Sequence, residues 1–212
     1  MKERGMIFNG EMVRAILDGR KTQTRRPIKW KQTRFTEIGE REDGTKWPWS
    51  EDAERACDFW HPCPFGAVGD RIWVRETFQG PLVHEELFEE YSAYPEKFET
   101  PEYCEYAADG GVRPEYCDLD DNLRHGWRPS IHMPRWASRV LLEITDVRVE
   151  RLKSISDGDA LREGCSTADM KSGDCVADVF ARLWASIYGA ESWNANPWVW
   201  VIEFKRVEGG TA

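Results

Sequence analysis

The stretch that decides the fold of this chain reads Ile16-Leu17-Asp18-Gly19-Arg20-Lys21-Thr22-Gln23-Thr24-Arg25-Arg26. Apolar residues in and before it recur at the spacing of one helix face, namely Val13, Ile16 and Leu17. Gly19 suits the left-handed position just past a helix end, and Pro27 blocks a further helix. The pattern therefore predicts a packed helix, followed by a turn or extended segment that holds Lys21 and Thr24 rigidly.

Lys21 and Thr24 are three residues apart, so a turn can point both side chains at one spot. A threonine hydroxyl is a weak nucleophile until a base takes its proton. A lysine whose pKa is lowered by burial or by nearby cations can be that base. Arg20, Arg25 and Arg26 supply such cations and also suit an anionic or nucleobase ligand. The alternative is a solvated basic loop in which Thr24 is an ordinary turn hydroxyl.

Length and composition predict one soluble domain, 1–212, with long insertions at about 30–64 and 79–138. The 41% share of hydrophobic residues is enough for a core. No run approaches the roughly 18 apolar residues of a membrane span, and no N-terminal segment resembles a signal peptide. We therefore expect a cytoplasmic protein with no membrane partner.

The formal net charge of −9 argues against a general nucleic-acid binder but hides a strong asymmetry. Residues 1–34 contain ten lysines and arginines against three acids, whereas residues 80–121 contain thirteen acids against Lys97 and Arg113. Residues 124–139 contain four arginines and no acid. Two basic segments around an acidic insertion indicate a local surface for an anion.

The six cysteines are expected to be free thiols, because the chain is of cytosolic type and contains no Cys-x-x-Cys. The cluster most similar to a metal site is Cys57-x3-His61-x-Cys63, whose spacing fits no common zinc knuckle. We therefore predict no metal ion and no cofactor.

The hydrophobic pattern predicts an α+β fold. Apolar faces and capping residues indicate helices over residues 10–18, 159–163 and 174–188. β-branched and aromatic residues indicate strands over residues 71–78, 139–152 and 198–204, the last of them apolar at nearly every position and therefore central. The sequence of residues 30–64 shows no steady period and predicts a long irregular excursion from the fold. The sequence of residues 79–121 predicts a peripheral insertion with short elements. The sum is a small, twisted, mixed or antiparallel sheet, barrel-like and flanked by helices.

Four pieces of the sequence occur in a recognisable order. They are Ile16-Leu17-x-Gly19-x-Lys21-Thr22-x-Thr24-x-Arg26, Gly69-Asp70 before a strand, Ile155-Ser156-x-x-Asp159-Ala160-x-x-Glu163-Gly164, and Trp200-Val201-Ile202-Glu203-Phe204. Together they resemble the ASCH domains, which share the PUA-like β-barrel. The longer pattern, including Cys63-Pro64 and residues 130–137, is similar to a phage- and prophage-encoded branch. The resemblance implies a PUA-like (ASCH) small mixed or antiparallel β-barrel with flanking helices and long insertions.

The resemblance also implies a function. ASCH and PUA-like domains are known mainly as RNA- or nucleotide-facing modules, and one small bacterial branch is similar to an amidohydrolase that deacetylates acetylcytidine. A lysine, a threonine and a glutamate carry that reaction, and by motif they fall on Lys21, Thr24 and Glu163. Arg26 matches a family arginine of the same pocket. The two long insertions depart from that compact branch.

In such a site the oxygen of Thr24 attacks an amide carbonyl, and Lys21 is first the base toward the hydroxyl and then the acid toward the leaving amine. Glu163 holds the ammonium of Lys21 or binds the exocyclic amine of the nucleobase. Arg26 or backbone N–H groups stabilise the oxyanion. The alternative for Glu163 is a solvated carboxylate at a helix end.

Five further residues are candidate contacts to a nucleotide. Arg75 and Glu76 end the strand after Gly69-Asp70, where a PUA-like cleft has a wall, and a structural Arg–Glu pair is the alternative. His132, Arg135 and Trp136 belong to a loop fixed by two prolines. The histidine there is a ligand contact or a structural residue, and the tryptophan stacks on a base or packs in the core.

Three functions follow from these observations. The first is recognition of RNA or of a modified nucleobase, nucleotide or nucleoside. The second is an amidohydrolase acting on an acetylcytidine-like nucleoside. The third is a phage assembly-associated protein without catalysis, for which the sequence shows no large apolar patch.

Overall fold

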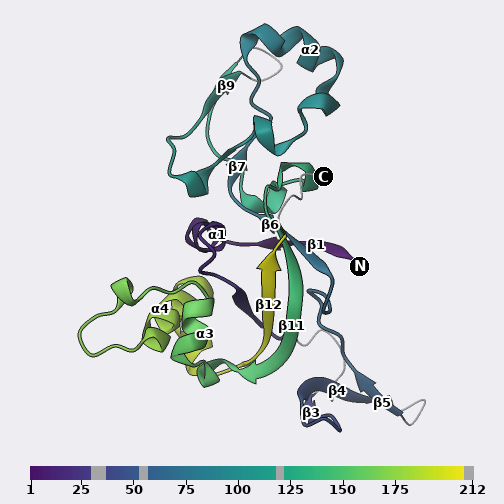
Figure 1. Ribbon diagram of the computed structural model, residues 1–212, viewed down its shortest axis with the longest axis vertical. Helices are drawn as coiled ribbons and strands as arrows, with labels where there is room; N and C mark the ends of the chain where they lie inside the picture. The colour runs from purple at the N-terminus through teal and green to yellow at the C-terminus, as the bar shows by residue number, and fades with distance from the viewer. Residues whose placement is uncertain (30–36, 53–56, 118–121, 208–212) are drawn as a thin grey trace. The chain divides into compact units, whose positions relative to one another are not determined.

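The computed structural model describes residues 1–29, 37–52, 57–117 and 122–207 (Figure 1). These residues form both helices and sheets, so the α+β class is confirmed. No closed barrel is detected among them. Every helix in this part of the chain is too short or too polar to cross a lipid bilayer.

Contacts divide the described residues into two compact units. The first unit comprises residues 1–2, 19–29, 37–52, 57–70 and 143–205. The second unit comprises residues 3–18, 71–117, 122–142 and 206–207. The insertion expected at 30–64 belongs to the first unit where it is described, and the insertion at 79–138 belongs to the second.

The sheet of the first unit has the strand order β11 (Leu141–Arg151), β12 (Trp198–Arg206) and β2 (Gln23–Pro27), with β11 counted from residue 143. β12 lies in the middle, as its apolar sequence predicts, and pairs antiparallel with β2. The register places Val201 opposite Arg25 and Ile202 opposite Thr24. Because side chains alternate along a strand, Val201 and Arg25 share one face of the sheet, and Ile202 and Thr24 share the other.

Three helices lie between β11 and β12 in the chain: α3 (Asp157–Arg162), α4 (Val176–Tyr188) and α5 (Ala190–Asn194). The hydroxyl of Ser156 accepts from Asp159 N, and the carboxylate of Asp159 accepts from Ser156 N, which is the capping box that the sequence predicts for α3. α4 ends at Gly189, also as predicted.

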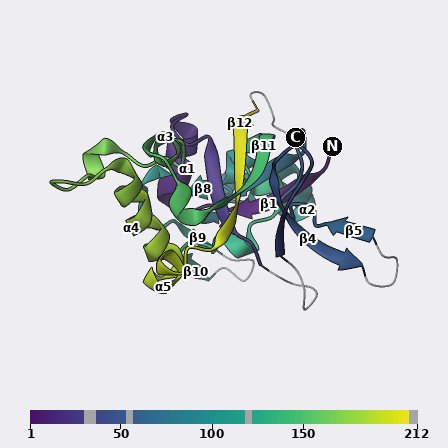
Figure 2. The same ribbon diagram turned by 90° about the horizontal axis from the view of Figure 1, so that it is seen from below.

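The helices of the first unit cover one face of its sheet. α3 and α4 lie side by side (Figures 1 and 2). Their buried side chains, among them Ala160 and Phe180, form one core with Val199 and Val201 of β12. Since Val201 lies opposite Arg25, the helix-covered face is the one that carries Arg25.

The prediction of an irregular excursion over residues 30–64 is wrong for the residues that the structure describes. They form an antiparallel sheet of β3 (Glu37–Glu40), β4 (Lys46–Asp52) and β5 (Cys57–Trp60), while residues 30–36 and 53–56 lie outside the description. Cross-strand aromatic pairing explains the sheet, since Trp49 lies opposite Trp60. Gly39 lets Trp60 pack against β3, because a Cβ there would lie 3.0 Å from the indole. Pro48 and the charged residues hide this pattern in the sequence.

The second unit pairs β1 (Glu3–Ile7) in parallel with β6 (Arg71–Arg75), and places α1 (Gly10–Leu17) between them in the chain. Asn9 caps α1 by accepting from Met12 N at 2.8 Å, and Gly19 has a φ of +74°, as expected for a residue just past the predicted helix over 10–18. Gly5 opposes Trp73, where a Cβ would lie 2.6 Å from the indole. The predicted strand over 71–78 is divided into β6 and β7 (Phe78–Gln79).

The acidic insertion has the short elements that the sequence predicts. β7 pairs with β8 (Glu105–Tyr106), and β9 (Glu115–Cys117) pairs with β10 (Leu123–His125). Between β7 and β9 lie α2 (Phe88–Ala93) and the 3₁₀ turns η1 (Glu85–Leu87), η2 (Pro95–Phe98), η3 (Pro101–Tyr103) and η4 (Ala107–Asp109). Phe98 is buried and contacts the rings of Tyr91 and Tyr103, which supplies a small aromatic core.

Candidate functional site

Lys21 lies in a short connection that is tied on both sides. The residue after it, Thr22, donates its N–H to Arg162 O at 2.8 Å, and its carbonyl accepts from Phe204 N at 2.9 Å. These bonds join the connection between α1 and β2 to the end of α3 and to β12. The rigid mounting expected from the sequence is therefore present at Lys21.

The ammonium of Lys21 is buried and fully hydrogen-bonded. Its side chain has no exposed area, and Nζ donates to Gln23 O at 2.7 Å, Glu163 O at 2.8 Å and Glu163 Oε2 at 2.7 Å. A lysine ammonium has three N–H groups, so each one has an acceptor. The expected roles of Glu163 were to hold this ammonium or to bind the exocyclic amine of a nucleobase, and the contact with the ammonium is present.

Glu163 caps the C-terminal end of α3 and is 2% exposed. Its second oxygen, Oε1, lies 3.4 Å from Nη1 of Arg25. Arg25 also contacts Glu150 at 3.1 Å and Asp159 at 3.4 Å, and donates to Gln23 Oε1. These contacts define a buried group of Lys21, Gln23, Arg25, Asp159 and Glu163, called the Lys21 cluster below.

Charges within the Lys21 cluster balance, since two cations face two carboxylates. At its edge, Arg148 contacts Glu150 and Glu203 at 2.6 Å and Asp146 at 3.1 Å. Burial acts to lower the pKa of Arg148. Its hydrogen bonds to Glu150 and Glu203 outweigh this effect and raise that pKa above its ordinary value. The cluster is thus the buried end of a longer network of ion pairs.

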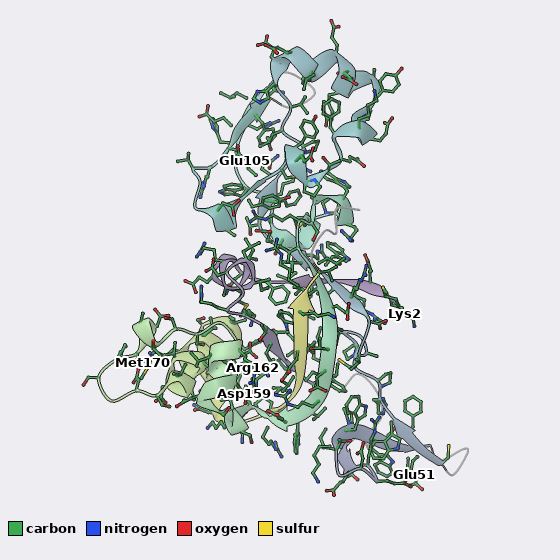
Figure 3. All side chains as sticks on the ribbon, viewed as in Figure 1. Lys2, Glu51, Glu105, Asp159, Arg162 and Met170 are labelled. Carbon is green, nitrogen blue, oxygen red and sulfur yellow. The ribbon has the colours of Figure 1, made fainter. Side chains whose placement is uncertain are left out.

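Asp159 connects the helix cap to the cluster. Asp159 and Arg162 both belong to α3 (Figure 3), and the guanidinium of Arg162 donates to the carboxylate of Asp159. Although burial acts to raise it, hydrogen bonds from Ser156 and Arg162 hold the pKa of Asp159 well below its ordinary value. The same carboxylate therefore fixes the start of α3 and orients Arg25.

Two effects oppose each other at Lys21. Burial lowers the pKa of Lys21, the carboxylate of Glu163 opposes that shift, and Arg26 adds to the lowering. All three acceptors around Nζ need a hydrogen, so the observed contacts require the protonated amine. Lys21 therefore combines a lowered pKa with partners that only its charged form satisfies.

Thr24 is buried in β2, at 1% exposed, but its side chain is not part of the Lys21 cluster. It lies between Gln23 and Arg25, whose side chains meet each other, so strand alternation turns Thr24 to the opposite face, beside Ile202. Among the hydrogen bonds of the described residues, none joins the hydroxyl of Thr24 to Lys21. The sequence prediction that both side chains point at one spot is not met in this arrangement.

The two arginines predicted to flank the site lie at its border. Arg20 is exposed and donates to Gly164 O at 3.1 Å, one residue past Glu163. Arg26 lies opposite Trp200, is half-buried, and its Nη1 lies 3.5 Å from the hydroxyl of Tyr188. Both belong to the first unit, together with Lys21, Thr24 and Glu163.

The other predicted contacts belong to the second unit, and Arg75 and Glu76 have structural partners there. Arg75 donates to the backbone carbonyls of Ser130 and Ile131. Glu76 is 1% exposed and pairs with both Nε and Nη2 of Arg139, at 3.0 and 3.1 Å. Glu76 therefore has a structural ion pair, but its partner is Arg139 and not the neighbouring Arg75 that the sequence suggested.

The loop between Pro129 and Ala137 contains the remaining three predicted nucleotide contacts. His132 is exposed in the 3₁₀ turn η5 (Ser130–His132). Arg135 and Trp136 lie in η6 (Arg135–Ala137), where Arg135 contacts Glu3 at 3.1 Å and Trp136 packs beside the core of Phe78. Their assignment to a nucleotide site stays a prediction, and the described contacts of Arg135 and Trp136 are structural ones.

Cys57, His61 and Cys63 are the residues that the sequence most nearly marks as a metal site. Neither Cys57 nor Cys63 forms a disulfide with a described residue, and His61 Nε2 lies 2.9 Å from the hydroxyl of Ser50. Burial lowers the pKa of His61. No group of three or more potential metal ligands is found in the described part of the chain.

Several residues of the Lys21 cluster were not predicted as site residues. The sequence suggested Arg25 only as a neighbouring cation and Asp159 only as a helix cap, and it gave no role to Gln23. The signal that could have found them is the alternation of side chains along β2. It places Gln23 and Arg25 on the same face of the strand, with Glu203 opposite Gln23. This alternation identifies the cluster only when the register of β2 against β12 is known.

Models of known protein families, curated proteins and solved structures were compared with the chain, and none of them matches it.

Proposed function

We propose that this chain is an ASCH-type, PUA-like protein that recognises RNA or a modified nucleobase or nucleoside, with the Lys21–Glu163 pair at the centre of its site. The observation that carries the proposal is the ion pair itself. Two residues singled out by their motifs, 142 positions apart, have Nζ and Oε2 at 2.7 Å and almost no exposed side-chain area.

Stability alone does not explain why a protein keeps a buried ion pair. Removing two charges from water costs on the order of several kcal/mol per ion, and an apolar pair of similar volume is often as stable. The pair and its neighbours place a carboxylate, an ammonium and a guanidinium together. These are the groups that read the amine and carbonyl edges of nucleobases, a carboxylate accepting from the exocyclic amine of cytosine.

Charged side chains at the border support the same function. Arg20 is exposed beside Gly164, and the side chain of Arg162 is 49% exposed above Asp159. A guanidinium presents a planar set of donors that suits phosphate and nucleobase oxygens. Arg162 precedes Glu163 in the chain and Arg20 contacts the residue that follows it, so both arginines border Glu163.

Deacylation of an acetylcytidine-like nucleoside is the second candidate, and the lowered pKa of Lys21 favours it. That reaction requires Lys21 to lose a proton and to reach the hydroxyl of Thr24. The three acceptors of Nζ and the orientation of Thr24 on the other sheet face favour recognition over catalysis in the arrangement described.

One set of experiments separates the two candidates. Calorimetry measures the binding of cytidine, acetylcytidine and a short RNA, and chromatography of the same samples detects deacetylation. Glu163→Gln tests the carboxylate. Thr24→Val removes one hydroxyl, with Thr22→Val as its matched control, because the described bonds of Thr22 use its backbone.

Recognition predicts that wild type binds at least one of these ligands and that Glu163→Gln weakens binding about tenfold, the loss of one charged hydrogen bond. Thr24→Val and Thr22→Val then bind like wild type. Turnover that is lost in Thr24→Val and kept in Thr22→Val establishes the amidohydrolase instead. Recognition is overturned when wild type binds none of the three ligands, or when a folded Glu163→Gln binds as tightly as wild type.

A further inference from the structure

A second cationic surface of the first unit lies where β11 ends. The guanidinium carbon of Arg151 lies 4.3 Å from the ring centroid of Trp198, at the start of β12. Lys153, in the 3₁₀ turn η7 (Leu152–Ser154), has its Nζ 5.9 Å from the ring centroid of Trp193 in α5. Arg151, Lys153, Trp193, Asn196 and Trp198 together are called the Arg151–Lys153 patch.

Asn196 binds the guanidinium of Arg151 and the backbone of Lys153. Its carbonyl accepts from Arg151 Nη1 at 3.1 Å, and its side-chain oxygen accepts from Lys153 N at 2.8 Å. Asn196 has a φ of +46°, and among the described residues it is the non-glycine residue with a positive φ. Such a conformation is uncommon outside glycine and persists where its surroundings enforce it. The patch is therefore a built arrangement and not a chance meeting of long side chains.

The cations of the patch have no carboxylate partner in the described part of the chain, although both residues are exposed. The contrast is with Arg148, three residues before Arg151, which contacts carboxylates of Asp146, Glu150 and Glu203. In a protein with a net charge of −9, two cations that are left without a carboxylate and placed over indoles form a distinct local feature.

The chemistry of the patch indicates its partner. Indole faces and guanidinium planes stack unpaired bases, and neighbouring cations pair with the phosphates between them. A double helix hides its base faces and needs many phosphate contacts, which two cations on an acidic protein do not supply. An acidic peptide would satisfy the cations but not the rings.

We propose that the Arg151–Lys153 patch binds a single-stranded nucleic acid, with bases stacked at Trp193 and Trp198 and phosphates at Arg151 and Lys153. The inference extends the proposed function from one nucleobase to the strand around it, but it rests on different residues. Glu163→Gln tests the first proposal and leaves the patch unchanged, so the two can fail separately.

The test is fluorescence anisotropy of a labelled single-stranded RNA, about 12 nucleotides long, measured over a range of salt concentrations. Arg151→Gln/Lys153→Gln removes both charges. Lys205→Gln is the matched control, because Lys205 is an exposed lysine of β12 in the same unit and pairs with Glu143 at 3.0 Å. Competitors are an abasic strand of equal length, a duplex and polyglutamate.

The patch predicts a plot of log affinity against log salt with a slope of about −1.4, from two phosphate contacts on a single strand. The double variant lowers affinity about tenfold and brings the slope close to zero, as expected from the loss of two phosphate contacts. Lys205→Gln changes neither, and the abasic strand competes less well than the RNA.

This proposal is overturned by no binding by wild type, by unchanged binding by the double variant, by an equal loss in Lys205→Gln, or by an abasic strand that competes as well as the RNA. Polyglutamate competing as well as the RNA would assign the patch to an acidic protein surface. A loss of binding in Glu163→Gln alone, with the double variant unaffected, would keep the proposed function and reject the patch.

Discussion

Two buried glutamates, one in each unit, are held by cations in different ways. Glu163 of the first unit divides its carboxylate between the ammonium of Lys21 and the guanidinium of Arg25. Glu76 of the second unit meets both Nε and Nη2 of one guanidinium, that of Arg139. A planar guanidinium fits two carboxylate oxygens at once, whereas an ammonium is a point charge with three separate donors.

The two arrangements also differ in what surrounds them. Arg139 continues to Asp109 at 2.7 and 2.8 Å and lies 3.9 Å above the ring centroid of Tyr106. Its partner Asp109 is 51% exposed, so this Arg139 clamp (Glu76, Tyr106, Asp109 and Arg139) reaches solvent. The Lys21 cluster keeps both charges of its central pair buried. The clamp fastens the turn η4 to the residue after β6, whereas the costlier Lys21 pair is the one that we propose for recognition.

The largest expected effect is that of Lys21→Met. The substitution leaves the carboxylate of Glu163 buried with only the 3.4 Å contact to Arg25, and we expect a loss of about 3–5 kcal/mol in the free energy of unfolding, measured in urea. The control is Lys21→Met/Glu163→Leu, which removes both charges. It should recover to within about 1 kcal/mol of wild type while losing ligand binding. An equal loss in the single and double variants would contradict the comparison.

Arg139→Met should cost less, about 2–3 kcal/mol, because the side chain of Arg139 is 21% exposed and water can partly replace it at Glu76. Arg139→Lys keeps the charge but not the planar fork, so it should fall between wild type and Arg139→Met in thermal and urea unfolding. An Arg139→Lys protein as stable as wild type would show that the bidentate geometry is unimportant.

Glu76 and Asp159 should contribute to the pH dependence of stability with opposite signs. Burial raises the pKa of Glu76 above its ordinary 4.5, although Arg139 opposes the shift, so the native state binds a proton more readily than the unfolded state. Its contribution to stability is present below pH 4.5 and is lost as the pH rises through the folded pKa. The pKa of Asp159 is lowered, so its contribution is present above pH 3.8 and is lost as the pH falls.

Urea titrations of wild type, Glu76→Gln and Asp159→Asn between pH 3 and pH 7, the range of carboxyl titration, measure both slopes. The stability of wild type relative to Glu76→Gln should increase toward acid. Relative to Asp159→Asn it should decrease below pH 3.8. Each change is limited to about 1.4 kcal/mol per pH unit for one proton. Two slopes of the same sign would show that burial does not dominate at Glu76.

The smallest effects are expected at the outer partners of the two arrangements. The side chains of Asp109 and Arg162 are 51% and 49% exposed, so solvent screens their ion pairs. Asp109→Asn and Arg162→Gln should each change the free energy of unfolding by about 0–1 kcal/mol. A loss above about 2 kcal/mol at either position would mean that the outer residue, and not the buried pair, holds its region together.

The parts of the fold that could be predicted from the sequence are those with local signals. Asn9, Ser156 and Gly189 fix helix ends through groups within four residues of them, and the apolar run of β12 marks a central strand. The sheet over β3, β4 and β5 was missed because its order depends on tryptophans paired across strands, as with Trp49 and Trp60. The hydrophobic period of one segment carries no information about which residues will pair across two strands.

For the candidate site, the sequence determined by itself that a helix would end at Gly19 and that Lys21 would follow on a fixed segment, because chain geometry and capping act locally. The resemblance to ASCH domains, and no pattern of the sequence alone, placed Lys21 and Glu163 in one expected site. Only the tertiary structure decided that Gln23, Arg25 and Asp159 join them and that Thr24 faces away. The reason is the register of β2 against β12 and α3: one residue of shift exchanges the two faces of a strand, and no local signal in β2 sets that register.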